Sequence, residues 1–82
     1  MRLDKFLKVS RIIKRRTVAN EACDAARVTV NGRVAKASYD VREGDIIEVA
    51  FDTRAIRIRV LDVKDSTKKA DAAEMYEVLP NS

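Results

Sequence analysis

The sequence predicts an α+β fold in which two N-terminal helices pack on a small, mostly antiparallel sheet, followed by a short C-terminal helix and strand. Three patterns predict it: helical spacing of apolar residues at the N-terminus, an Asn-Gly pair between alternating apolar residues, and a longer alternating stretch at 55–63. The 82 residues suffice for one domain, because a second hydrophobic core could not be built from the remainder. Helices come first and strands follow, which is typical of an α+β chain.

The N-terminal third is expected to form two short helices. Leu3, Phe6 and Leu7 lie at positions i, i+3 and i+4, which predicts a helix over about 3–10. Thr17 is expected to cap a second helix. Along that helix small side chains form a narrow stripe against which another element can pack: Ala19, Ala22, Cys23 and Ala26. Cys23 is therefore interpreted as a small buried hydrophobic residue.

The first two strands are predicted around a tight turn. Residues 28–34 alternate on both sides of Asn31 and Gly32, and an Asn-Gly pair is the strongest short signal for a two-residue hairpin. A second turn is expected at 43–45, where a glycine stands between two acidic residues.

Three further strands are predicted downstream. Residues 46–51 are rich in β-branched residues, and 55–63 place Ile56, Ile58 and Val60 on one face. Residues 65–74 suggest a loop and one short helical stretch, and 75–79 a last strand that Pro80 ends.

Charge is distributed unevenly along the chain. The net charge is +4, but residues 1–36 carry ten basic and three acidic side chains, whereas residues 37–82 carry seven basic and ten acidic ones. A basic surface gains affinity for a polyanion by releasing condensed counterions, so nucleic acid is the expected partner. The acidic residues Glu43, Asp45, Glu48, Asp71, Glu74 and Glu77 are expected to form a sheet side that stays off the nucleic acid.

The composition argues against an enzyme. The chain has no histidine, which removes the commonest general base and metal ligand, and its two glycines stand far apart, so there is no glycine-rich phosphate loop. We therefore predict no catalytic residues, no metal and no cofactor. With one cysteine and no long apolar run, the chain is expected to be a cytoplasmic monomer without a membrane segment.

The candidate binding site is the basic cluster of the first half. The backbone N–H groups and the positive dipole end at the start of the second helix would reinforce these side chains as a phosphate site. The predicted RNA-binding residues are Arg2, Lys5, Lys8, Arg11, Lys14, Arg15, Arg16, Thr17, Arg33 and Lys36.

Four segments carry a family resemblance. Residues 2–7 (Arg-Leu-Asp-Lys-Phe-Leu), 14–17 (Lys-Arg-Arg-Thr), 28–32 (Val-Thr-Val-Asn-Gly) and Lys36 with Gly44-Asp45 resemble the S-four domain, an RNA-binding module named after the fourth small-subunit ribosomal protein. The resemblance implies an αL motif, two helices laid on a small sheet that hold structured RNA. It covers 1–62 as an S-four RNA-binding domain, with 63–82 expected to be a C-terminal extension packed on the same domain.

The tail refines this resemblance. Residues 65–76 are similar to the RqcP (YabO) family of stand-alone S-four proteins in bacterial ribosome-associated quality control. That similarity implies binding to large-subunit rRNA and peptidyl-tRNA on obstructed large ribosomal subunits, beside the partner RqcH, to support alanine tailing of stalled nascent chains. The alternative is a heat-shock-type S-four protein that recycles free large subunits with stranded nascent chains. That branch carries a longer basic C-terminal extension, so we expect this chain to belong with the RqcP family.

Two alternative hypotheses for the function remain open beside the resemblance. Two short basic helices also fit a DNA-binding regulator, although the second helix offers only Asn20 as a base-edge reader. A structural protein with solvated charges is the other alternative.

S-four domains usually place a glycine where the second helix meets the first strand, and here residues 25–27 are Ala-Ala-Arg. If the helix ends in a left-handed residue, alanine there costs about 1 kcal/mol relative to glycine.

Overall fold

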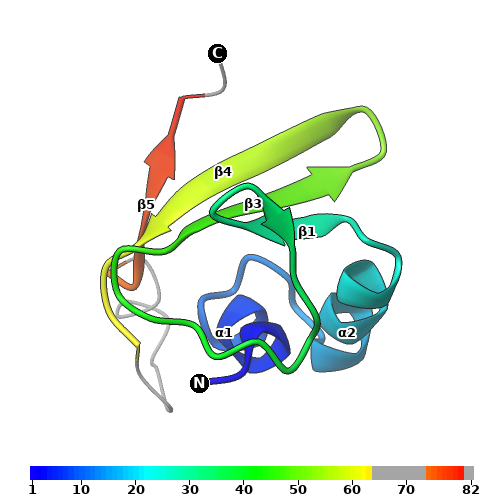
Figure 1. Ribbon diagram of the computed structural model, residues 1–82, viewed down its shortest axis with the longest axis horizontal. Helices are drawn as coiled ribbons and strands as arrows, with labels where there is room; N and C mark the ends of the chain where they lie inside the picture. Colours follow the sequence, from blue (N-terminus) through cyan, green and yellow to red (C-terminus); the bar gives the residue numbers. More distant parts are fainter. Residues whose placement is uncertain (64–73, 81–82) are drawn as a thin grey trace.

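The computed structural model describes residues 1–63 and 74–80, and it shows two helices on one face of a five-stranded sheet (Figure 1). In the described residues the elements are α1 (Leu3–Val9), α2 (Arg16–Asp24), β1 (Val28–Val30), β2 (Arg33–Val34), β3 (Ile46–Phe51), β4 (Arg54–Val60) and β5 (Tyr76–Leu79). The strand order is β2-β1-β3-β4-β5, and each neighbouring pair is antiparallel. The predicted fold class is confirmed, and the short helix expected within 65–74 falls outside the described residues apart from its last position.

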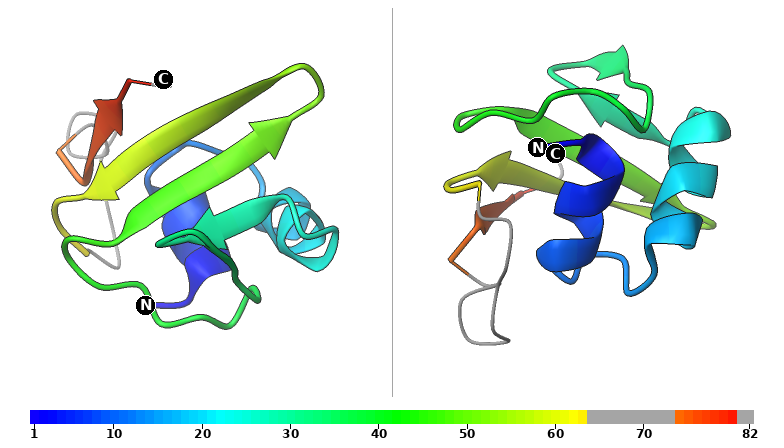
Figure 2. Two further views of the ribbon diagram at one scale, coloured as in Figure 1. Left: turned by 45° about the horizontal axis from the view of Figure 1, so that its top comes forward. Right: turned by 90° about the horizontal axis from the view of Figure 1, so that it is seen from below.

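The core lies between the two helices and the sheet. The second view of Figure 2, taken from below, shows α1 and α2 side by side in front of the strands. From α1, Leu3, Phe6 and Leu7 are fully buried, which confirms the helical spacing expected for them. They pack in one cluster with the inward-facing residues of the central strands, among them Ile47 and Ile58.

The predicted hairpin is present at Asn31 and Gly32. Both residues have positive φ, +53° and +83°. A two-residue hairpin requires this, because only such a turn matches the twist of the two strands that it joins. The Asn31 amide also ties this turn to the next strand: its Oδ1 accepts from the Ile46 N–H at 3.0 Å, and its Nδ2 donates to Asp45 at 3.1 Å. The turn thus sets the position of β3 beside β1.

The C-terminal end of α2 is closed by a left-handed alanine. Ala26 has φ +59°, its N–H donates to the carbonyl of Cys23, and the N–H of Arg27 donates to the carbonyl of Ala22, both at 3.0 Å. These two bonds form a Schellman motif, in which glycine is the usual left-handed residue. Ala19 and Cys23 are buried as the stripe predicted, but Ala26 is exposed because the helix has already ended.

The prediction that Thr17 caps α2 is wrong. The helix begins at Arg16, Arg15 is the preceding extended residue, and no side chain caps the helix by a hydrogen bond. Thr17 lies inside the first turn, where its backbone is already helical, so its hydroxyl cannot act from the cap position.

The fourth strand is shorter than expected, and β5 begins close to its predicted start. β4 ends at Val60 because the N–H groups of Leu61 and Asp62 both donate to the carbonyl of Met75 instead of continuing the ladder. Met75 is fully buried, and the strand that follows it pairs with β4. The last strand was predicted at 75–79 and is found at Tyr76–Leu79.

Candidate nucleic-acid interface

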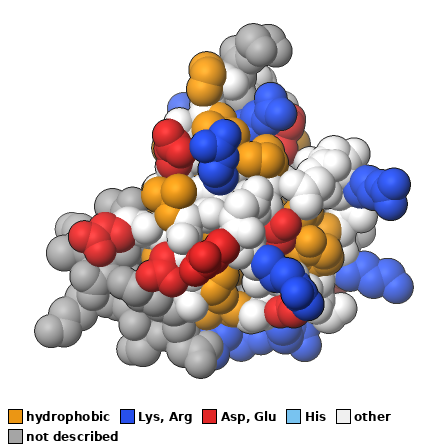
Figure 3. All heavy atoms as spheres, turned by 60° about the vertical axis from the view of Figure 1, so that its left-hand side comes forward, with side chains coloured by type: hydrophobic (Ala, Val, Ile, Leu, Met, Phe, Trp, Pro, Cys, Tyr) orange, Lys and Arg blue, Asp and Glu red, His pale blue; other side chains and the backbone are white. Residues whose placement is uncertain are grey.

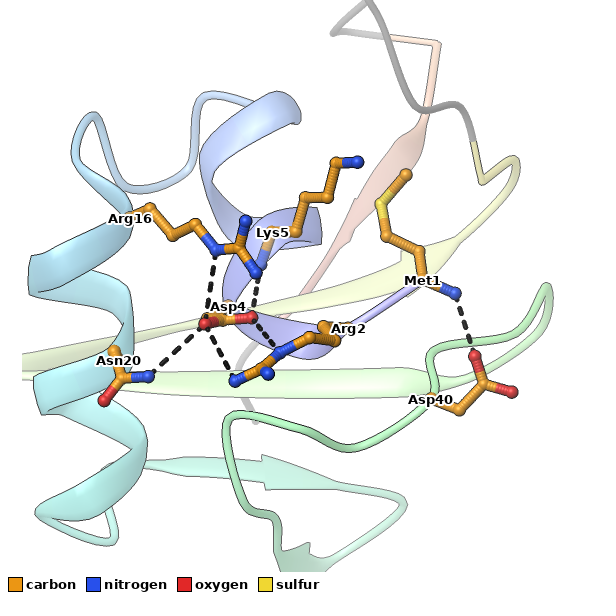
Figure 4. Close-up of polar contacts among 7 residues, drawn as sticks. All are labelled: Met1, Arg2, Asp4, Lys5, Arg16, Asn20 and Asp40. Carbon is orange, nitrogen blue, oxygen red and sulfur yellow. Dashed lines mark hydrogen bonds and ion pairs between the residues drawn. The ribbon is translucent and has the colours of Figure 1, made fainter.

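The carboxylate of Asp4 is the centre of the polar contacts between the two helices. Asp4 lies in the first turn of α1, and its side chain is only 3% exposed. Arg2 donates to it through Nε at 3.2 Å and Nη2 at 3.4 Å, and Arg16 donates through Nε at 3.3 Å. The N–H of Lys5 and the amide of Asn20 complete the set at 2.8 Å and 3.3 Å. Figure 4 shows the donors converging on Asp4 from both helices.

These donors keep the buried carboxylate charged. Burial alone raises the pKa of Asp4, since it disfavours the ionised form, but the hydrogen bonds from Asn20, Arg16, the Lys5 backbone and Arg2 outweigh it. The net result is a pKa below the ordinary value. A fixed negative charge therefore stands between Arg2 and Arg16.

Arg2 and Arg16 each contact Asp4, yet part of each side chain remains accessible to solvent. Their side chains remain about half exposed, 52% for Arg2 and 47% for Arg16, although both contact a buried carboxylate. Arg16 uses only its Nε for Asp4, and its Nη atoms have no partner among the described residues. A guanidinium fixed through Nε presents its outer donors in a set direction, which suits the bidentate recognition of phosphate.

One further predicted residue lies beside this pair. Lys36 lines the same shallow hollow as Arg2 and Asn20, between α2 and the loop after β2. The backbone of that loop is tied to α1, because the N–H of Leu3 donates to Tyr39 at 2.8 Å. The fold thus brings residues from positions 2, 16, 20 and 36 to one place.

The other predicted basic residues are more dispersed. Arg33 lies on β2 and lines a separate hollow with Lys36. Lys14 lies toward the other side of α2, in a hollow that it shares with Val18 and Phe51. The remaining predicted residues are exposed on α1, on the connection between the helices or in the first turn of α2, except that Lys5 is half-buried: Lys5, Lys8, Arg11, Arg15 and Thr17.

The loop between the helices contains a strained basic residue. Arg11 has φ +63° and follows Ser10, which closes α1. A non-glycine residue in this region costs on the order of 1 kcal/mol. The first turn of α2 contains no acidic residue, so the positive end of its dipole adds to the basic side chains around it.

Sequence patterns alone do not identify Asp4 and Asn20, the two residues that organise this site. In the sequence Asp4 is one of three acidic residues in a basic segment, and Asn20 is a possible reader of base edges. The signal for Asp4 was its position: it stands on the helix side next to buried Leu3 and Leu7, where an acidic residue needs partners. The partners of Asp4 lie up to sixteen positions away, which composition does not reveal.

The expected acidic sheet side is mixed in charge. On the outer face of the sheet, Glu48 stands opposite Arg57, and Arg59 stands opposite Glu77 with an ion pair of 3.5 Å. Asp45 is occupied by Asn31 and by the hydroxyl of Tyr39. Figure 3 shows acidic side chains across the middle of one face, with basic ones along its lower and right-hand margins and near its top. The two charges are therefore less segregated in space than along the sequence.

Other chemistry finds little support in the described residues. Burial raises the pKa of the Cys23 thiol to about 11, with Asp4 and Asp24 adding to the effect, so the thiol is neutral at pH 7 and a poor nucleophile. Residues 1–63 and 74–80 contain no group of three or more Cys, Asp or Glu side chains placed to hold a metal ion. No helix in these ranges is long and apolar enough to span a bilayer.

Comparisons with known proteins agree on one family. The family model described as "S4 domain" matches residues 1–47. The chain is 57% identical to the "RQC P-site tRNA stabilizing factor" of Streptococcus pneumoniae and 54% identical to that of Bacillus subtilis. Both alignments cover 96% of this chain, with 90% and 92% of the respective relatives.

A second group is more distant. The "Heat shock protein 15 homolog" of Aeromonas salmonicida is 33% identical over 94% of this chain and 59% of its own length. The trimeric structure of Vibrio cholerae Heat Shock Protein 15 superposes with a TM-score of 0.89 at 28% identity, covering 96% of this chain and 81% of that one. This chain thus shares its fold with the Vibrio cholerae protein, and its sequence identity is higher with the first group.

Proposed function

We propose that this protein is an RNA-binding factor of ribosome-associated quality control. The chain belongs to the S4 domain family and, within it, to the RQC P-site tRNA stabilizing factors. On this proposal it binds rRNA and peptidyl-tRNA on large ribosomal subunits that a stalled nascent chain obstructs. It thereby supports alanine tailing of that chain by RqcH. The site of action would be the cytoplasm, where ribosomes are.

One observation carries the RNA-binding part of this proposal. Arg2 and Arg16 are fixed by a buried, ionised Asp4 and remain about half exposed. Two guanidinium groups held in set directions can each bind a backbone phosphate. Binding then costs less side-chain conformational entropy than it would for an arginine that is not held in place. Structured RNA presents such phosphates at fixed spacing, so the pair favours a folded RNA over a flexible polyanion.

The protein contributes binding rather than chemistry in this scheme. Positioning a tRNA needs cationic and polar contacts to its backbone, and the predicted residues from Arg2 to Lys36 supply them. We propose all ten predicted residues as the RNA-binding set, with Arg2 and Arg16 at its centre and Lys36 beside them. We also propose that one copy suffices, which sedimentation velocity of the purified protein would check, since the Vibrio cholerae relative is described as trimeric.

The DNA-binding alternative fits the site less well. Its base reader would be Asn20, whose amide donates to Asp4 at 3.3 Å and is partly buried. To read a base edge Asn20 would have to leave a buried carboxylate, which carries an energetic cost. The exposed donors are arginines and lysines, which contact phosphate and carry little sequence information.

The experiment that tests the function uses a deletion strain. Alanine tails on nascent chains from stalled ribosomes are measured without the gene, and again after restoring wild type or Arg16→Ala. We expect the tails to disappear on deletion and to return only with wild type. Tails that persist undiminished in the deletion strain would refute this function and favour the recycling of free large subunits.

A further inference from the structure

An apolar groove lies between α2 and the far end of the sheet. Two adjoining hollows share Ile12 and Phe51: one continues along β4 and β5 past Ile56 and Val78, and the other continues along α2 past Val18. Val18, Phe51 and Val78 are 45%, 40% and 61% exposed. In Figure 1, β4 and β5 extend toward the top of the view, away from the two helices.

The groove and the Asp4 cluster, which consists of Asp4, Arg2, Arg16 and Asn20, lie on opposite sides of α2. A helix turns by about 100° per residue, so Val18, Glu21 and Ala25 lie about half a turn away from Arg16 and Asn20. Val18, Glu21 and Ala25 line the groove, whereas Arg16 and Asn20 contact Asp4. One ligand can therefore occupy the groove while RNA occupies the other side.

The rim of the groove is basic. Lys14 and Arg27 line it on the helix side, and Arg54 on the sheet side, against one acidic residue, Glu21. None of these three basic side chains forms an ion pair with another residue in the described parts of the chain. Their charges are available to an incoming group of opposite sign.

We propose that this groove docks a segment of a partner protein whose apolar side chains are flanked by Asp or Glu. Apolar anchors would fill the hollows at Phe51 and Val18, and the flanking carboxylates would meet Arg54 and Arg27. This is the usual anatomy of a protein interface, an apolar centre within a polar rim. The site goes beyond RNA binding and would couple the RNA-bound protein to a second component.

The apolar floor favours a protein over a second RNA. Interfaces with nucleic acid are polar and strongly basic throughout, because phosphates and sugars offer little apolar surface. Here the basic residues lie at the rim, and the floor consists of aliphatic side chains and one phenylalanine. A phosphate over that floor would lose its hydration without a donor in return.

The test uses two designed amphipathic peptides of about three helical turns, identical in their leucines and carrying either Glu or Lys on the other face. Binding is measured by fluorescence anisotropy, and the contacted residues are mapped by NMR chemical-shift changes. We expect the Glu peptide to bind, with shifts at Ile12, Val18, Phe51 and Val78. Val18→Asn, and independently Val78→Asn, should weaken binding at least about tenfold.

The controls distinguish binding in the groove from nonspecific hydrophobic binding and from RNA binding. Leu61→Asn alters a leucine that is 46% exposed, against 45% for Val18, outside the groove, and should leave peptide affinity unchanged. The double variant Arg54→Glu with Arg27→Glu should reverse the preference toward the Lys peptide. Val18→Asn should bind large ribosomal subunits as wild type does, so a failure here is distinct from a failure of the proposed function.

Three results would overturn the proposal. The first is equal affinity for the Glu and Lys peptides in the wild-type protein. The second is a loss of subunit binding in Val18→Asn as large as its loss of peptide binding, which would make the groove an RNA surface. The third is self-association of the purified protein that Val18→Asn abolishes, which would make a second copy the occupant.

Discussion

The Nε of Arg16 lies 3.3 Å from the buried Oδ2 of Asp4, twelve positions earlier in the chain. This contact ties the start of α2 to the start of α1 and fixes the direction of the Arg16 guanidinium. Because Arg2 reaches the same carboxylate, a single buried charge positions both arginines. Asp4 is thus a positioning residue for the basic face, and the predictions below begin with it.

The ionisation of Asp4 should be visible in the pH dependence of stability. The folded pKa of Asp4 lies below its ordinary value of 3.8, so its contribution is present above that value and is lost as pH falls through the lowered folded pKa. Urea unfolding of wild type and Asp4→Asn should therefore differ less and less as pH drops below about 4. The pKa of Asp40 is also lowered, first by its hydrogen bond to the terminal ammonium, so only the difference between the two proteins isolates Asp4. A constant difference across this range would contradict the account.

Binding to RNA should weaken steeply with salt. If about four to six basic side chains sit at phosphates, the slope of log K against log salt should be about −3 to −5. Removing Arg2 or Arg16 should each reduce the slope by about one. The measurement is binding to large-subunit rRNA over a salt series, with duplex DNA as the comparison. A slope near zero would remove the electrostatic basis of the site.

Ala26→Gly should stabilise the protein by about 1 kcal/mol. Ala26 occupies the left-handed position of the Schellman motif with φ +59°, and glycine adopts this conformation without the steric cost of a Cβ. Chemical denaturation measures the gain. Ala25→Gly is the matched control, since Ala25 has φ −84°, and glycine there should be neutral or destabilising. A loss of stability in Ala26→Gly would mean that the strain lies elsewhere.

We propose that residues 63–82 belong to the same folding unit as the preceding domain. Met75 is fully buried in the core, and β5 pairs with β4 from Val60 to Arg57. Met75→Ala should therefore cost about 2 to 5 kcal/mol, as Leu7→Ala should at the centre of α1. Both variants should unfold in a single transition. A separate, earlier transition in Met75→Ala would show that the tail is an independent unit.

Local patterns predicted the elements well. The i, i+3, i+4 spacing of Leu3, Phe6 and Leu7 and the Asn31-Gly32 turn are short-range signals, and both are confirmed because nothing in the tertiary structure opposes them. The strand boundary at Val60 was missed because it depends on Met75, which returns to the sheet from fifteen positions away. The helix cap was missed because Thr17 satisfies a local preference that the fold does not use.

The site was predicted in composition but not in organisation. Counting charges identifies a basic first half, and the structure groups Arg2, Arg16 and Lys36 within it. The sequence cannot show that Lys14 turns to the opposite side of α2, since this depends on how the helix packs. It also cannot show that Asn20 is occupied by Asp4, because a side-chain contact across two helices leaves no local pattern.

The central claim is that Arg16, held by Asp4, binds RNA on the obstructed large subunit. The most direct test compares Arg16→Ala with Arg59→Ala, because Arg59 is also half exposed and ion-paired, but lies on the outer face of the sheet. Both variants should stay folded, since Asp4 keeps Arg2, Asn20 and the Lys5 N–H as partners when Arg16 is removed.

The measurement is co-sedimentation of each purified variant with large ribosomal subunits that carry a peptidyl-tRNA. Loss of a charged contact to phosphate should reduce the affinity of Arg16→Ala about tenfold or more, while Arg59→Ala sediments like wild type. Equal binding by the two variants, or an equal loss in both, would contradict the assignment of the Asp4 cluster as the RNA site.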